Sequence, residues 1–229
     1  MKKITSLLLI LVVVAGLISL YTACKSEPSS DVNQDKIYTE YALYYDGNAD
    51  KTYARASFKF SNIAGTLLEL DAPSEVTFNS DVLTFNSTLA YYEKEYAGLI
   101  SSGTFVWTDL DGNSFTNAIT MKPITFPAVI DSINKDSAFT LYWVGDSLSA
   151  DESVTLTAVD ASLSPQIFYQ NDINSNYVIL AANQLALLLD GSSTLNFDRY
   201  YKPALVQQNT AGGLITGHYR PPQKTAILY

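Results

Sequence analysis

Residues 52–60 alternate between side chains that prefer the interior and side chains that prefer solvent. Ala54, Ala56 and Phe58 share one side of an extended backbone with Phe60. Because successive side chains of a strand point to opposite faces, this alternation predicts a strand with one face on a core. Residues 37–45 and a turn at Asp46-Gly47-Asn48 precede it, so the first two strands are expected to form a hairpin.

Similar short segments recur along the rest of the chain, separated by turn residues. We expect strands at 66–70, 75–78, 82–85, 104–108, 114–120, 138–144, 153–159, 177–181, 194–201, 213–219 and 224–228. Residues 91–96 fit either a strand or a loop. The one helix expected is short, with Asn183 capping residues 184–189.

This pattern, together with 16 Tyr and 10 Phe, predicts an all-β fold. Residues 121–127 contain two prolines, which suit a junction better than a central strand. We therefore expect two immunoglobulin-like β-sandwich domains in tandem, at 37–122 and 123–229. One larger sandwich or jelly roll is the alternative.

Each of these domains is expected to have its own core. The candidate core residues are Ala54, Phe58, Phe60, Leu68 and Trp107 in the first, and Leu141, Trp143, Val154, Leu156, Ile179 and Leu188 in the second.

The N-terminus carries a leader that ends at the only cysteine. Lys2 and Lys3 precede an uncharged stretch from residue 4 to residue 20, and Ala23 stands directly before Cys24. The segment resembles the lipobox of bacterial lipoproteins, although Tyr21 stands where that family usually has Leu. The resemblance implies a signal peptide at 1–23 and acyl chains on Cys24, followed through residue 36 by a polar, flexible tether.

Two or three acyl chains on Cys24 would hold the protein stably in a lipid bilayer, because one chain alone binds only marginally. The implied location is the cell envelope, as an outer-membrane lipoprotein. Removing residues 1–23 leaves 12 basic residues (14 minus Lys2 and Lys3) against 23 acidic ones, a net charge of −11. Such a body repels nucleic acid, so no nucleic-acid partner is expected.

The leader and the tyrosine-rich body also resemble lipoproteins of the Bacteroidota, which O-glycosylate exported proteins at Asp-(Ser/Thr)-small-apolar tripeptides. The chain has three such tripeptides, centred on Ser132, Ser137 and Ser147. The resemblance implies O-glycosylation at these serines. Turns that precede strands are the alternative reading of the same residues.

Three groups of residues are candidates for chemistry, and each has a simpler structural interpretation. Asp109–Asn113 has the glycine too early for a calcium loop, which favours a hairpin turn. His218, the only histidine, is expected to be a hydrogen-bonded or solvated strand residue. Glu93 and Glu95 would share one strand face, where paired carboxylates could hydrolyse glycosides but solvation is the default.

Trp107, Trp143 and the many tyrosines could form a sugar-stacking platform, but the apolar strands of the two tryptophans favour core positions. The sequence contains no nucleophile-elbow or phosphate-loop motif, and it indicates no catalytic residue, cofactor or metal ligand. We therefore expect a non-enzymatic binding or structural role with an unknown protein or glycan ligand. A fimbrial or adhesin subunit and a glycan-acting hydrolase are the alternatives.

Overall fold

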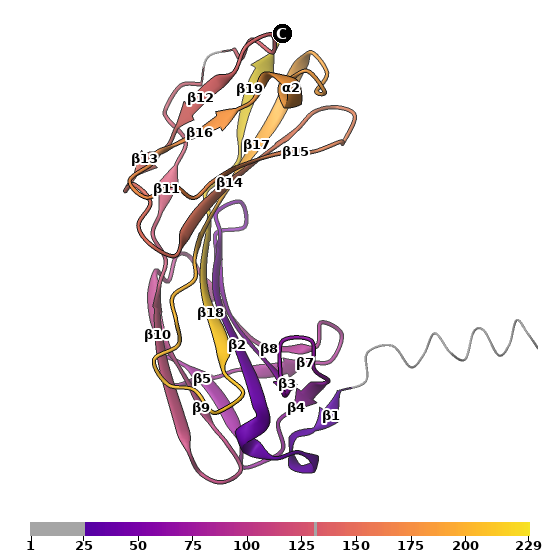
Figure 1. Cartoon of the computed structure of the whole chain (residues 1–229), viewed down its shortest axis with the longest axis vertical. Coiled ribbons are helices and arrows are strands. Elements are labelled where there is room, and N and C mark those ends of the chain that lie inside the picture. The colour runs from indigo at the N-terminus through magenta and orange to yellow at the C-terminus, as the bar shows by residue number, and fades with distance from the viewer. Residues whose placement is uncertain (1–25, 131) are drawn as a thin grey trace, which may run out of the picture.

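The structure is a computed structural model that describes residues 26–130 and 132–229. The chain folds into an elongated, curved molecule made almost entirely of strands (Figure 1). The predicted all-β class is confirmed, with several sheets in a sandwich-like arrangement. Among the described residues, no helix is both long and apolar enough to cross a membrane.

The largest sheet follows the order β1-β4-β3-β2-β18-β17-β14-β15. These strands are β1 (Glu27–Pro28), β4 (Leu67–Glu69), β3 (Lys51–Phe60), β2 (Ile37–Asp46), β18 (Gly213–Arg220), β17 (Gly191–Tyr201), β14 (Glu152–Val159) and β15 (Gln166–Gln170). Three further strands join it as branches: β7 (Thr84–Asn86), β8 (Tyr91–Ala97) and β19 (Lys224–Leu228).

The other strands form three smaller sheets. One has the order β10-β9-β5-β6, formed by β10 (Ser114–Thr120), β9 (Ser102–Thr108), β5 (Glu75–Phe78) and β6 (Asp81–Val82). Two-stranded sheets pair β11 (Ile124–Thr125) with β13 (Val144–Gly145), and β12 (Phe139–Tyr142) with β16 (Tyr177–Leu180). The large sheet lines the concave side of the molecule, and the smaller sheets lie on the convex side (Figure 1).

In the lower half of Figure 1, the large sheet packs against the four-stranded sheet. The inward face of β2 carries Tyr41, which stacks on Phe105 of β9 with ring centroids 5.1 Å apart. Phe58 of β3 is fully buried and packs on Trp107, 5.2 Å away. The buried-then-exposed alternation of β2 and β3 matches the pattern seen in the sequence.

The upper half of Figure 1 repeats this arrangement with other strands. Phe197 of β17 lies between Phe126, 4.3 Å away, and Trp143, 6.3 Å away, which come from the convex side. Val154 and Leu156 of β14 are fully buried in the same layer. The buried apolar side chains of both halves form a single connected cluster.

Strand β18 joins the two halves. It belongs to the later part of the sequence, but it pairs in parallel with β2 over its whole length, from Gly213 opposite Thr39 to Arg220 opposite Asp46. Its other edge pairs with the end of β17. Gly217 lies so close to the end of β10 that a Cβ there would stand 3.2 Å from the oxygen of Thr120. One sheet therefore crosses the boundary expected near residue 122, and the independence of the two segments remains a prediction.

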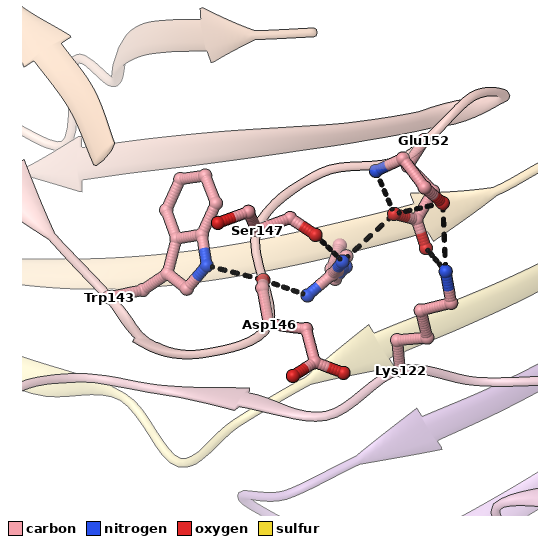
Figure 2. Close-up of polar contacts among 7 residues, drawn as sticks. Lys122, Trp143, Asp146, Ser147 and Glu152 are labelled. Atoms are coloured by element: carbon pink, nitrogen blue, oxygen red, sulfur yellow. Dashed lines mark hydrogen bonds and ion pairs between the residues drawn. The ribbon is translucent and has the colours of Figure 1, made fainter. Parts of the chain in front are cut away.

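A buried ion pair lies beside this crossing, in the region drawn in Figure 2. Arg199 of β17 is 1% exposed and contacts Glu152 of β14, with Nη2 2.9 Å from Oε2. The guanidinium also donates to the backbone oxygens of Asp146 and Ser147, at 2.8 and 3.0 Å. Lys122, from the segment between the halves, lies 3.0 Å from Oε1 of Glu152 (Figure 2). The network ties that segment to the two central strands.

Most of the strands expected from the sequence are present, and residues 91–97 also form one. Strand β15 was not anticipated, because its apolar residues lie on both faces: Phe168 is buried while Ile167 and Tyr169 are exposed. The helix prediction is wrong in detail. Helix α2 covers only Ala182–Leu185, and its N-cap is Ala181 rather than Asn183, because the chain turns toward β17 after Leu185.

Two candidate core residues are exposed. Phe60 is 39% exposed, since it ends β3 beyond the reach of the facing sheet. Ile179 is 51% exposed, because Val178 and Leu180 take the inward face of β16. The other candidates are buried: Ala54, Phe58, Leu68, Trp107, Leu141, Trp143, Val154, Leu156 and Leu188.

The described end of the expected tether forms short elements that contact the rest of the fold. Residues 27–28 form β1, and two 3-10 turns cover Ser29–Asp31 and Gln34–Lys36. Ser29 is fully buried and accepts a hydrogen bond from the backbone of Asp71. Gln34 is 7% exposed and donates to the backbone oxygen of Ser29. Polar composition did not reveal the contact of Ser29 with Asp71, because it joins residues far apart in the chain.

Candidate functional site

Four aromatic side chains form one row across the solvent-facing side of the large sheet. Tyr53, Tyr44, His218 and Tyr200 occupy directly opposed positions on β3, β2, β18 and β17. Their rings stack in sequence, with centroid distances of 5.8, 4.4 and 4.2 Å. Each stacked pair contributes roughly 0.5–1.5 kcal/mol beyond simple burial. We call these four residues the aromatic row.

The next row across the same face of the sheet has small side chains at its centre. Arg55, Ala42 and Thr216 are opposed on β3, β2 and β18, and Lys202 directly follows β17. Small side chains at the centre, with long ones at the ends, leave an open hollow of about 470 Å³ beside the aromatic row. Its lining is Ala42, Tyr44, Arg55, Tyr200, Lys202, Thr216, His218 and Arg220. We call this space the concave-face hollow.

Basic side chains line the hollow, and the acidic partners of two of them lie outside its lining. Nε of Arg55 lies 2.6 Å from Glu93, and Arg220 donates to both carboxylate oxygens of Asp198, at 2.8 and 3.1 Å. The two carboxylates do not line the hollow, whereas both guanidinium groups do. Lys202 is exposed and has no ion-pair partner among the described residues, although it lies 5.5 Å from the centre of the Tyr200 ring.

Asp198 fixes the two side chains that border it. His218 Nε2 lies 2.6 Å from Oδ1 of Asp198, which Arg220 also contacts. Burial alone would raise the pKa of Asp198, but the hydrogen bonds and charges of His218 and Arg220 outweigh burial and lower it. Asp198 is therefore ionised at neutral pH and holds both side chains in place.

Two phenol groups of the aromatic row, those of Tyr44 and Tyr200, are protonated at neutral pH. Burial raises the pKa of Tyr44 to about 12, against a smaller lowering effect of Arg220. Burial also raises the pKa of Tyr200, with a further contribution from Asp198. These phenols can therefore act as hydrogen-bond donors to a ligand as well as acceptors.

His218, Glu93 and Glu95 all make polar contacts with neighbouring strands of the large sheet. His218 is a hydrogen-bonded strand residue, as expected, although its position in a stacked row was not foreseen. Glu93 and Glu95 do share a face of β8, where they pair with Arg55 and Lys51 at 2.6 Å each. They act as ion-pair partners of the neighbouring strand.

Of the aromatic residues considered for a sugar-stacking platform, the two tryptophans are buried and several tyrosines reach the surface. Trp107 and Trp143 are 1% and 3% exposed and donate to Ser74 and to the backbone of Asp146, so the prediction of core positions is confirmed. The row on the solvent-facing side consists of three tyrosines and His218, all of them partly buried. A sequence signal did exist, since Tyr44 and Tyr53 stand symmetrically about the first turn. The contributions of His218 and Tyr200 depend on long-range pairing.

The segment 109–113 forms the hairpin turn between β9 and β10, as predicted. Gly112 has φ +82°, and the carboxylate of Asp109 accepts from the backbone and side-chain nitrogens of Asn113. In the described parts of the chain, no group of three His, Cys, Asp or Glu residues is placed to hold a metal ion.

Cys24 and the signal segment 1–23 lie outside the described residues. The three candidate glycosylation serines, Ser132, Ser137 and Ser147, are all exposed. Their modification remains a prediction from resemblance.

The sequence matches no protein-family model and no curated protein. Among solved structures, it is similar to a tetra-tandem repeat in the extending region of a large adhesion protein, with 14% identity and a TM-score of 0.24. That match covers 83% of this chain and 49% of the other, so the chain spans about half of that structure's length.

A second similar structure is SGBP-B of the Bacteroides ovatus mixed-linkage glucan utilization locus, in complex with a mixed-linkage heptasaccharide. The identity is 11% and the TM-score is 0.26, with 90% of this chain and 66% of the other covered.

Proposed function

We propose that this protein is a non-enzymatic binding module that holds a saccharide in its concave-face hollow. The observation that carries the proposal is the open hollow of about 470 Å³, which is floored by Ala42 and Thr216 and walled by three members of the aromatic row, Tyr44, His218 and Tyr200. Saccharides combine hydroxyl groups with weakly apolar ring faces. Phenols, a hydroxyl and guanidinium groups around a small apolar floor complement both features.

Rigidity supports a binding role for this surface. Each strand that contributes to the hollow is paired on both edges along at least part of its length, and Asp198 fixes His218 and Arg220. Side chains that are already ordered lose little conformational entropy when a ligand binds. The hollow therefore suits a ligand that is recognised without rearrangement.

A glycan array probed with the full-length chain in detergent tests the proposal. We expect binding to a subset of saccharides, and we expect Ala42→Phe to abolish it by filling the floor of the hollow. Thr216→Phe serves as a second variant that fills the same space from β18. Undiminished binding by both variants, with unchanged thermal unfolding, would place any saccharide site elsewhere.

The attachment of this module to a membrane is a further part of the proposal. We propose that Cys24 carries acyl chains that anchor the protein in a cell-envelope bilayer, after removal of residues 1–23. Cys24→Ser should then abolish labelling with palmitate and leave a larger precursor. Normal labelling and processing of this variant would contradict the lipid anchor.

The carboxyl groups with altered pKa values favour binding over hydrolysis. Burial alone would raise the pKa of Glu152. Hydrogen bonds from Ser149, Lys122 and Arg199 outweigh burial, so the pKa is lowered. The pKa of Asp198 is also lowered. A glycosidase general acid needs a raised pKa, so neither carboxyl group resembles one.

A further inference from the structure

We infer that the concave-face hollow selects acidic polysaccharides that carry carboxylates on their sugar rings. This inference rests on the proposed saccharide-binding function and specifies the charge of the ligand. It starts from a contrast within the chain, whose formal net charge is −9. The hollow, however, is lined by Arg55, Arg220 and Lys202 and by no carboxylate.

The cations at the two ends of the hollow have capacity for a further partner. Arg55 uses Nε for Glu93, and its two terminal nitrogens make no hydrogen bond with any described residue. Those nitrogens form the planar fork that matches a carboxylate. At the opposite end, Lys202 has no ion-pair partner in the described parts of the chain.

The spacing of the two ends favours a chain of acidic sugars over a single small anion. Arg55 and Lys202 stand on the outer two of four neighbouring strands, β3, β2, β18 and β17. Three gaps of ~4.8 Å between strands separate their backbones by about 14 Å. Glu93 of β8 holds Arg55 on the side of β3 away from Ala42. Carboxylates on separate rings of one polymer therefore match the separation of Arg55 and Lys202 better than a single carboxylate does.

Calorimetric titration of the full-length chain with polygalacturonate, alginate and fully methyl-esterified polygalacturonate tests this inference. We expect at least one acidic polymer to bind. We also expect at least tenfold weaker binding of the esterified polymer, which keeps the backbone but lacks the charge. Raising the salt concentration should weaken the binding of the acidic polymer.

Two matched variants locate the charge effect. Lys202→Gln should weaken binding of the acidic polymer at least fivefold. Lys94→Gln removes one charge from the opposite face of β8, outside the hollow, and should leave affinity unchanged. An equal loss in both variants would show that net charge, and not the hollow, is responsible, and would overturn the inference.

The remaining outcomes separate the two proposals. Equal binding of the esterified polymer, still abolished by Ala42→Phe, would overturn acidic selectivity and leave saccharide binding intact. A second outcome would also overturn acidic selectivity and leave saccharide binding intact. In it, neither acidic polymer binds, but neutral saccharides from the array do bind and Ala42→Phe abolishes their binding. Equally tight binding of polyglutamate would show that the hollow recognises anions of any backbone and would overturn the saccharide class.

Discussion

Arg199 is a buried cation whose partners all come from segments that meet in the middle of the molecule. Its guanidinium contacts Glu152 and two backbone oxygens of the loop after β13. A buried charge of this kind is stable only while its partners remain. Substitution of Arg199 therefore measures how much these contacts stabilise the centre of the molecule.

Arg199→Met should lower the free energy of unfolding by about 3–5 kcal/mol, because it leaves Glu152 buried beside one remaining cation, Lys122. Adding Glu152→Gln should recover part of this loss, since glutamine still accepts from the backbone of Ser149. Urea denaturation of the single and double variants measures the coupling. As a control, Arg55→Met breaks a partly exposed pair and should cost about 1 kcal/mol or less. Equal losses for both arginines would contradict the central role of Arg199.

Stability should also fall in acid. The pKa values of Glu152 and Asp198 are lowered in the folded state relative to about 4.3 and 3.9 when unfolded. The unfolded chain therefore binds protons first, so this stabilisation is complete above about pH 5 and is lost as pH falls through the folded pKa values. Thermal midpoints measured from pH 7 to pH 3 should decline at the acid end. Glu152→Gln should make this decline shallower, and an unchanged slope would count against the assignment.

At the scale of the strand, the position within the element decides how much a side chain contributes. Phe58→Ala removes a fully buried ring of β3 and should cost about 3–5 kcal/mol. Phe60→Ala, two residues later on the same face, should cost about 1 kcal/mol or less, because Phe60 is 39% exposed. Chemical denaturation of both variants checks the difference. Similar costs would mean that the end of β3 is packed as tightly as its middle.

From the pairing of β18 with β2, we expect residues 37–122 to need the later segment in order to fold. A fragment of residues 37–122 lacks the strand that covers one edge of β2. An uncovered edge exposes unpaired backbone groups, so this fragment should aggregate or give a collapsed amide spectrum. Mixing it with residues 123–229 should restore dispersed signals. A dispersed spectrum from residues 37–122 alone, overlaying that of the whole chain, would show that the segment folds independently.

Local patterns in the sequence were sufficient for elements whose partners lie close along the chain. The hairpin of β2 and β3 follows from alternation and one turn, and so does the hairpin around Gly112. Strand β15 was missed because both of its faces are apolar. The pairing of β18 with β2 joins residues far apart in the chain, and no local pattern reports such a contact.

The candidate site has the same dependence on long-range pairing. Tyr44 and Tyr53 face each other across a predicted hairpin, so half of the aromatic row was within reach of the sequence. His218 and Tyr200 reach it only because β18 lies between β2 and β17. The small residues Ala42 and Thr216 carry no sequence signal at all. Their importance is that neighbouring strands place them side by side.

At the scale of the whole molecule, the continuous sheet and its curvature present one long concave face. The aromatic row crosses that face at the end of β17, where β18 pairs with it. A ligand in the concave-face hollow would contact β2 and β3 of the first half and the end of β17 of the second half. Binding and the connection between the halves should therefore be coupled.

His218 allows the most direct test of a binding site in the concave-face hollow, because it is the only histidine and lines that hollow. Its imidazole signals in nitrogen-resolved NMR spectra report on this one place. Adding a saccharide selected by the array, or polygalacturonate, should shift these signals in a saturable manner, and Ala42→Phe should abolish the shift. Saturable binding by calorimetry with unmoved His218 signals would contradict the account.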